Sequence, residues 1–217
     1  MDNYKHSYSK TVGSNLRMFL RFLVTEGLCQ SELIDAVPKI ANWKMVDIPR
    51  HLPAEDVESV IASSGGRAQC KLRDRAVILL LARLGLRARD IAGLQLLDIN
   101  WQQGLIRVMG KGRRETWLPL PQDAGDALLE YLVEERPPST CQQVFLCSRA
   151  PFRPFKGISS VQHIARCALR DAAVQRPVGV VTHLFRHSLA RRLLAQDIPL
   201  EWIGVIDREL QVLKSQL

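Results

Sequence analysis

The stretch that decides the fold is residues 105–119, which read Leu-Ile-Arg-Val-Met-Gly-Lys-Gly-Arg-Arg-Glu-Thr-Trp-Leu-Pro. Two runs in which apolar and polar residues alternate, 105–109 and 115–119, flank a basic loop that contains two glycines. This pattern is typical of a β-hairpin. It is the one clear β segment of the sequence, so we expect an α+β fold that is mainly α, with a small β-hairpin or sheet.

The rest of the chain favours helices. Apolar residues recur at helical spacing over 11–26, and Gly27 is placed to stop that helix. Ser31 is placed to cap a short second helix that ends before Pro38. Further helices are expected at about 54–63, 72–84, a short one carrying Asp90, 123–135, 159–174 and 183–196.

The domain organisation follows from a break at residues 44–53, which contain two prolines and no clear periodicity. This composition predicts a linker. The two helices before it can form only a thin core, so residues 1–43 are expected to be part of a helical domain. Residues 54–217 are then expected to form a second, mixed domain.

The charge is unevenly distributed. Lys and Arg number 30 against 22 Asp and Glu, which leaves a net charge of +8. Residues 1–66 carry 7 basic and 8 acidic side chains, whereas the remainder carries 23 and 14. This excess favours a polyanionic partner for the second part of the chain. The alternative is a basic protein without a nucleic-acid role.

The five cysteines are odd in number and scattered, without a CxxC or Cys/His cluster. We therefore predict reduced thiols, no metal site and no cofactor. The polar start of the chain is unlike a signal peptide, and the longest strongly apolar run, 77–82, is too short to span a bilayer. The default expectation is a cytoplasmic protein that does not contact membranes.

A first candidate site residue is Arg87, which follows an apolar helix and Gly85. An arginine on such a support can present its planar fork to a phosphate. Asp90 lies three residues further on and could orient the guanidinium. The alternative is an ordinary surface ion pair.

A second candidate is Lys111, which sits at the tip of the predicted hairpin between Gly110 and Gly112. The glycines allow the backbone to approach a ligand closely, and Arg113 and Arg114 add positive charge that favours DNA. A lysine delivered into a minor groove could protonate a leaving 5′ oxygen. The alternative is a solvated basic turn.

The third group lies at the start of a predicted helix with Thr182 as its N-cap. His183, Arg186 and His187 share one side of that helix, while Phe185 points toward a core. A basic helix N-terminus is unusual unless an anion offsets its charge. Two arginines, a lysine and a histidine match what metal-free catalysis at a phosphodiester requires, namely charge clamps and proton donors or acceptors.

Three motifs in order resemble those of the tyrosine recombinases of the phage integrase family. They are 84–91 (Leu-Gly-Leu-Arg-Ala-Arg-Asp-Ile), 108–112 followed by 118–120 (Val-Met-Gly-Lys-Gly and Leu-Pro-Leu), and 182–188 (Thr-His-Leu-Phe-Arg-His-Ser). The separations, 24 positions from Arg87 to Lys111 and 72 from there to His183, also match those of the family. The similarity runs from about residue 16 to 206.

The resemblance implies a function in DNA integration and recombination. Arg87 and Arg186 would clamp the scissile phosphate, Lys111 would protonate the 5′ oxygen, and His183 would assist proton transfer. Asp90 would hold Arg87 in place. Family members attack the phosphate with a C-terminal tyrosine and need neither metal nor ATP. A helical core-binding (SAM-like) domain and a mixed catalytic domain close around duplex DNA, and four protomers assemble on two sites.

The sequence also departs from the family pattern. No tyrosine follows Tyr131, and residues 205–209 replace the expected Leu-Gly-His segment. The resemblance therefore implies a chain that is short at both ends and contains no nucleophile of its own. Two hypotheses remain open: an integrase/recombinase that receives its tyrosine from another protomer or chain, or a catalytically inactive DNA-binding remnant of a mobile element.

Overall fold

The computed structural model describes residues 2–38, 51–64, 71–109, 115–175 and 181–197. The chain divides into two compact units, Met1–Ile48 and Pro49–Leu217, and each is described by itself. The division falls inside residues 44–53, the segment predicted as a linker. Because most of that segment lies outside the described residues, its role as a linker stays a prediction.

The first unit contains two helices, α1 (Asp2–Thr25) and α2 (Glu32–Ala36). Helix α1 starts well before residue 11, so the predicted helix was too short. Gly27 ends it as predicted, with a φ of 70° that favours glycine and with its N–H donating to the Val24 carbonyl. The prediction that Ser31 caps α2 was wrong, because its side chain makes no capping hydrogen bond.

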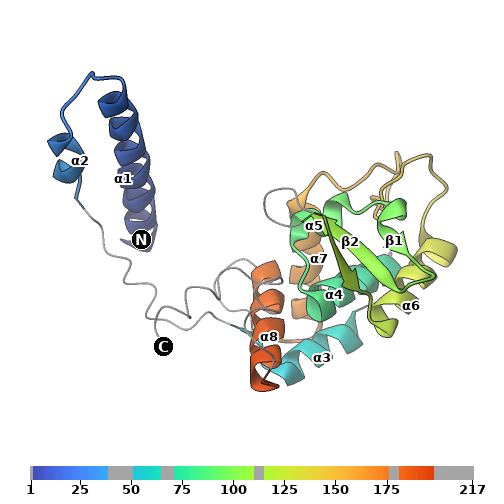
Figure 1. Ribbon diagram of the computed structural model, residues 1–217. Coiled ribbons are helices and arrows are strands. Elements are labelled where there is room, and N and C mark those ends of the chain that lie inside the picture. Colours follow the sequence, from blue (N-terminus) through green and yellow to red (C-terminus); the bar gives the residue numbers. More distant parts are fainter. Residues whose placement is uncertain (1, 39–50, 65–70, 110–114, 176–180, 198–217) are drawn as a thin grey trace. The chain divides into compact units, whose positions relative to one another are not determined.

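The second unit holds most of the secondary structure (Figure 1). Its elements are α3 (Ala54–Ser63), α4 (Lys71–Leu84), α5 (Ala88–Gly93), a 3₁₀ turn η2 (Leu96–Asp98), β1 (Ile99–Asn100), β2 (Leu105–Met109), β3 (Glu115–Pro119), α6 (Gln122–Glu130), a π-helical turn η4 (Tyr131–Glu135), α7 (Ile158–Asp171) and α8 (Val181–Ala195).

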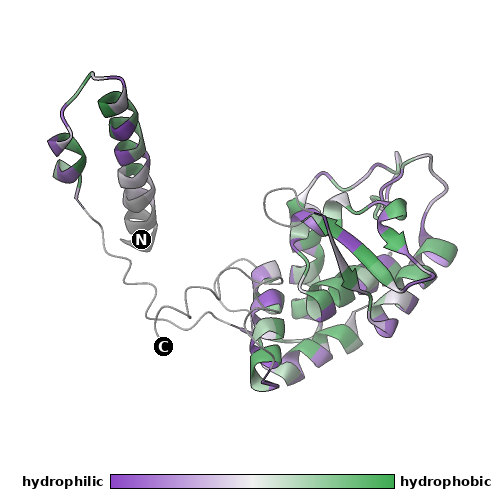
Figure 2. Cartoon of the chain, viewed as in Figure 1, coloured by the Kyte–Doolittle hydropathy of each residue, from purple (hydrophilic) through white to green (hydrophobic). Residues whose placement is uncertain are grey.

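Helix α4 is the centre of this unit. Residues 76–82 are all buried, so the helix is enclosed on every side rather than along one stripe. It packs against α3, α6, α7 and α8, and Figure 2 shows it as predominantly hydrophobic. Side chains from these helices and from the sheet form one continuous core. The end of α4 therefore provides a rigid support for the residues that follow it.

The sheet has three antiparallel strands in the order β1-β2-β3. The predicted hairpin is present, with Arg107 opposite Trp117 and Ile106 opposite Leu118. Ile106 faces the core, whereas Arg107 lies on the outer face and pairs with Asp98 and Glu115. Strand β1 was not predicted, since two residues cannot display an alternation. The predicted fold class, mainly helical with a small sheet, is confirmed.

The helix predicted at 123–135 continues beyond α6 as the π-helical turn η4. Tyr131 at the start of this turn is buried and stacks on Phe145. Its hydroxyl accepts a hydrogen bond from the backbone N–H of Leu146 at 3.2 Å. Tyr131 is thus a core residue. Within the described ranges, no helix is both long enough and apolar enough to cross a bilayer.

Candidate functional site

The sharp corner between α4 and α5 positions Arg87. Gly85 follows the last residue of α4 with a φ of 59°, a left-handed conformation that glycine adopts without strain. Leu86 is buried, and Arg87 then forms the N-cap of α5 with its side chain 45% exposed. The corner thus anchors the backbone in the core and leaves the guanidinium accessible.

Asp90 lies in the first turn of α5, and one of its carboxylate oxygens is 4.0 Å from a guanidinium nitrogen of Arg87. Burial raises the pKa of this carboxyl above its usual value, although the positive charge and backbone amide of Arg87, and the charge of Arg186, act in the opposite direction. The contact with Arg87 is at the outer limit of an ion pair, so Asp90 orients the arginine only loosely.

Helix α8 carries the other predicted site residues. It begins at Val181, so the prediction that Thr182 is its N-cap was wrong; Thr182 is a buried residue of the first turn. His183 is exposed on the same side as the half-buried His187, and their rings meet edge to face with centroids 6.4 Å apart. Phe185 is fully buried, as its place on the opposite side predicts.

Arg186 is buried in spite of its charge, with 9% of its surface exposed. Its guanidinium donates a hydrogen bond of 2.5 Å to the carbonyl oxygen of Gly85, 101 positions earlier in the sequence. This bond ties α8 to the corner that carries Arg87. The planar fork of an arginine has five N–H groups, and the Gly85 carbonyl accepts from one of its terminal nitrogens.

One pocket of about 350 Å³ brings most of the predicted residues together. Arg87, His183, Arg186 and His187 all line it. A smaller cavity of about 30 Å³ adjoins it and is lined by Arg87, Arg186 and Asp90 together with residues of β2 and β3. None of the described residues lining the larger pocket is acidic, so its electrostatic character suits an anion.

The three basic residues of the hairpin loop, Lys111, Arg113 and Arg114, lie outside the described residues. Their predicted roles therefore stay predictions. The strands on either side of the loop are described, and Met109 and Thr116 at their ends line the smaller cavity beside Arg87 and Arg186. The parts of β2 and β3 that flank residues 110–114 thus lie next to the two arginines.

Two polar residues of the larger pocket were missed by the sequence analysis. Arg89 stands inside the first quoted motif, two residues after Arg87, and Gln162 lies on α7. The signal for Arg89 was its charge beside another arginine in a short exposed turn. Gln162 carries no comparable signal, because a polar residue on an amphipathic helix usually faces only solvent.

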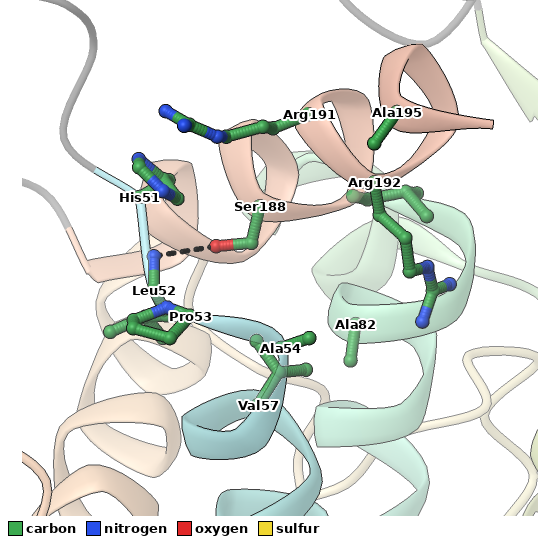
Figure 3. Close-up of a pocket in the computed structure, with 11 residues that line it drawn as sticks. His51, Leu52, Pro53, Ala54, Val57, Ala82, Ser188, Arg191, Arg192 and Ala195 are labelled. Carbon is green, nitrogen blue, oxygen red and sulfur yellow. Dashed lines mark hydrogen bonds between the residues drawn. The ribbon is translucent and has the colours of Figure 1, made fainter. Parts of the chain in front are cut away.

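A second pocket of about 330 Å³ lies at the other half of α8 and is mainly apolar (Figure 3). Leu52, Pro53 and Val57 line it on one side, and Leu189 and Ala195 on the other. The Ser188 hydroxyl accepts a hydrogen bond of 2.7 Å from the Leu52 backbone N–H. None of the predicted site residues lines this pocket. The hydrogen bond between Leu52 and Ser188 anchors the start of the second unit to α8.

The donor set of the larger pocket consists of guanidinium, imidazole and amide groups. These groups bind anions, whereas a metal ion would need carboxylates, thiolates or several converging imidazoles. Over the described ranges, no cluster of three or more His, Cys, Asp or Glu is arranged to hold a metal ion.

Residues 50–206 match the model of the phage integrase family. Among curated proteins, an integrase/recombinase of Sinorhizobium fredii, y4rA, is 41% identical over 91% of this chain and 48% of its own length. The tyrosine recombinase XerD of Lacticaseibacillus casei is 33% identical over 83% of this chain and 61% of its own length. The chain thus spans about half the length of the first of these relatives.

Solved structures with a similar fold include a dimer of lambda integrase (residues 75–356) bound to a COC′ core site. It matches with a TM-score of 0.68 and 17% identity, over 94% of this chain and 70% of its own. The XerA recombinase matches with a TM-score of 0.63 and 20% identity, over 78% of this chain and 56% of its own. At these identities, the likeness concerns the fold.

Proposed function

Because this chain belongs to the phage integrase family of tyrosine recombinases, we propose that its larger pocket binds a backbone phosphate of duplex DNA as part of DNA strand cleavage and rejoining. The observation that carries the proposal is that Arg87 converges on one pocket with His183 and Arg186, which lie far from it in the sequence, and that none of the described residues lining this pocket is acidic. The +8 net charge and the DNA complexes among the solved neighbours support it.

The proposed roles rest on the chemistry of the side chains and on the resemblance to the family, and for Arg87 and Arg186 also on their place in the pocket. Arg186, held by the Gly85 carbonyl, and Arg87 contact the nonbridging oxygens, on which the transition state concentrates negative charge. His183 takes part in proton transfer at the exposed side of the pocket. Lys111, on the loop between β2 and β3, protonates the 5′ oxygen when its bond to phosphorus breaks. His187, Arg113 and Arg114 contact the DNA around this phosphate.

The attacking group in this proposal is a tyrosine hydroxyl, and Tyr131 does not suit that role. Tyr131 is buried in the core, its hydroxyl is hydrogen-bonded to the Leu146 amide, and burial raises its pKa. We therefore propose that cleavage depends on a tyrosine of another protomer or polypeptide, in an assembly of several protomers on DNA.

The second candidate function is DNA binding without cleavage. The burial of Tyr131 favours it, because this tyrosine is not accessible as a nucleophile, whereas binding of a phosphate needs none. Such a protein would occupy recombination sites and would not open them.

Binding is tested with a fluorescein-labelled duplex of about 30 base pairs and a salt titration. The logarithm of the binding constant should fall linearly with the logarithm of salt, by about 0.9 per contacted phosphate. Arg87→Ala should weaken binding and make this slope shallower by about 1. Lys71→Ala is the control of equal charge, because Lys71 begins α4, about 20 Å from the corner where that helix ends. Salt-insensitive binding by the wild type contradicts the proposal.

Cleavage is tested with a nicked duplex, which traps a covalent tyrosyl–phosphate intermediate when one forms. The chain alone should give no adduct that survives boiling in detergent. Addition of a related recombinase whose own Arg clamp is mutated should give an adduct on the related protein if tyrosine is supplied in trans. An adduct on the chain itself would contradict the need for a second polypeptide.

A further inference from the structure

Gln162 projects from α7 into the pocket that we propose for the phosphate. Helix α7 is amphipathic, with Val161, Ile164 and Ala165 in the core. Gln162 is partly exposed and lines the pocket together with Arg87, His183 and Arg186. It therefore lies where a ligand of these residues would lie, although it comes from a helix that carries none of the predicted site residues.

The orientation of the Gln162 amide follows from its neighbour one turn along. The guanidinium of Arg166 donates a hydrogen bond of 3.3 Å to the amide oxygen Oε1 of Gln162. Arginine has only donors, so the oxygen has to face Arg166. The NH₂ group of Gln162 is then left as the part of the amide that can donate elsewhere.

The pocket supplies a reason for such a donor. Its charged and titratable lining residues, within the described part of the chain, are Arg87, Arg89, His183, Arg186 and His187. None of these described lining residues offers a carboxylate to the amide NH₂, and a phosphate oxygen is an acceptor that guanidinium, imidazole and amide N–H groups can all bind.

We infer that Gln162 is an additional, uncharged phosphate donor of this site, oriented by Arg166. The inference rests on the proposed function, since it names a further contact to the same DNA backbone. Gln162 donates an N–H to a nonbridging oxygen of the clamped phosphate or of its neighbour in the strand. Arg166 acts on the DNA only through the amide that it orients, and is in this respect a positioning residue.

Recognition of a base is the competing role for a glutamine beside DNA. Glutamine reads adenine by a bidentate contact that uses both its amide oxygen and its NH₂ group. Here the amide oxygen already accepts a hydrogen bond from Arg166. Only the NH₂ group is left to contact the DNA, so the bidentate contact to adenine is not formed. The geometry therefore favours the phosphate, which needs donors alone.

The test compares Gln162→Ala with Gln122→Ala. Gln122 is a matched control, because it too makes a hydrogen bond to a side chain four residues on, with Asp126 on α6, and does not line the pocket. With the full chain and a labelled duplex, Gln162→Ala should weaken binding about tenfold, as expected for loss of a hydrogen bond to a charged group. The salt slope should not change, since no charge is removed.

Two further variants sharpen the result. Gln162→Glu keeps the length of the side chain and can still pair with Arg166, but it presents only acceptors to the phosphate, so it should weaken binding more than Gln162→Ala. Arg166→Ala should weaken binding less than Gln162→Ala, and its effect should largely vanish in the Gln162→Ala background. Additive effects of the two changes would overturn the positioning role of Arg166.

Each outcome decides the inference. An equal loss on two duplexes of different base composition, with an unchanged melting temperature, supports a phosphate contact. A loss on only one duplex would make Gln162 a base-reading residue, and an effect no larger than that of Gln122→Ala would remove it from the site. If Arg87→Ala weakens binding while Gln162→Ala does not, only this inference fails. If the wild type itself shows no salt-dependent binding, the proposed function fails with it.

Discussion

The two arginines of the pocket come from regions with opposite surroundings. On α8, Arg186 is buried and its guanidinium is hydrogen-bonded to the carbonyl oxygen of Gly85. At the corner after α4, Arg87 is 45% exposed, and a carboxylate oxygen of Asp90 is 4.0 Å from its guanidinium. Of the two arginines that we propose as a phosphate clamp, Arg186 is held by a hydrogen bond within the fold, whereas the exposed side chain of Arg87 can adapt to a ligand.

The difference shows how the structure places a rigid arginine, Arg186, beside an adaptable one, Arg87. The acceptor that fixes Arg186 belongs to the corner from which Arg87 projects, since Gly85 and Arg87 are two residues apart. The hydrogen bond therefore sets the distance between the two supports without restraining the Arg87 side chain. Removing Arg186 should affect both folding and binding, whereas removing Arg87 should affect binding alone.

The largest expected effect comes from Arg186→Ala. The buried Gly85 carbonyl loses its donor, which should lower the free energy of unfolding by about 1–3 kcal/mol. Affinity for duplex DNA should fall by about tenfold or more, because a charge-assisted contact is lost. Urea denaturation and fluorescence anisotropy measure the two effects. An unchanged urea midpoint would show that Arg186 is not fixed by the fold, and the comparison would break.

Arg87→Ala should give the complementary result. Affinity should fall about tenfold through loss of one charged hydrogen bond to phosphate. The free energy of unfolding should stay within about 0.5 kcal/mol of the wild type, as is usual for exposed side chains. The same two measurements apply, and a stability loss as large as that of Arg186→Ala would mean that both arms are structural.

Ser188→Ala tests the anchoring of α8 separately from phosphate binding. The variant removes the hydroxyl that accepts from the buried Leu52 amide, which should cost about 1 kcal/mol of stability. DNA affinity should be nearly unchanged at temperatures where the protein is folded. Ser188→Thr is the control, since it keeps the hydroxyl and its extra methyl group can occupy the adjoining pocket. If threonine fails to restore the melting temperature, the hydroxyl is not what anchors the helix.

Much of this architecture could be predicted because it is encoded locally. Helix α3 has the predicted bounds, and the hairpin has the predicted strands, since periodicity over five or more residues reports directly on burial. Gly85 as the end of α4 was recognisable from its position after an apolar run. Strand β1 and the start of α1 were not, because two residues show no period and polar residues can extend a helix.

The candidate site was only partly predictable. The side that His183, Arg186 and His187 share follows from helical spacing alone. The hydrogen bond between Arg186 and Gly85 joins residues 101 positions apart, and no local pattern encodes it. The approach of Gln162 to the pocket depends on how α7 packs beside α8. Such long-range contacts are decided by the core, and the sequence reveals them only through the fold.

The smallest expected effect belongs to Asp90→Asn, which probes the adaptable arm. Burial raises the pKa of Asp90, so the native state binds this proton more tightly than the unfolded chain does. The Asp90 carboxyl therefore stabilises the native state below its ordinary pKa of about 3.9. This stabilisation is lost as the pH rises through the higher pKa of the native state. The asparagine variant lacks this loss. Its stability relative to the wild type should increase from pH 3.5 to pH 7, as measured by urea denaturation at both values. A decrease over the same range would mean that the charge of Arg87 outweighs burial, and that the carboxylate holds this arm more firmly than a separation of 4.0 Å indicates.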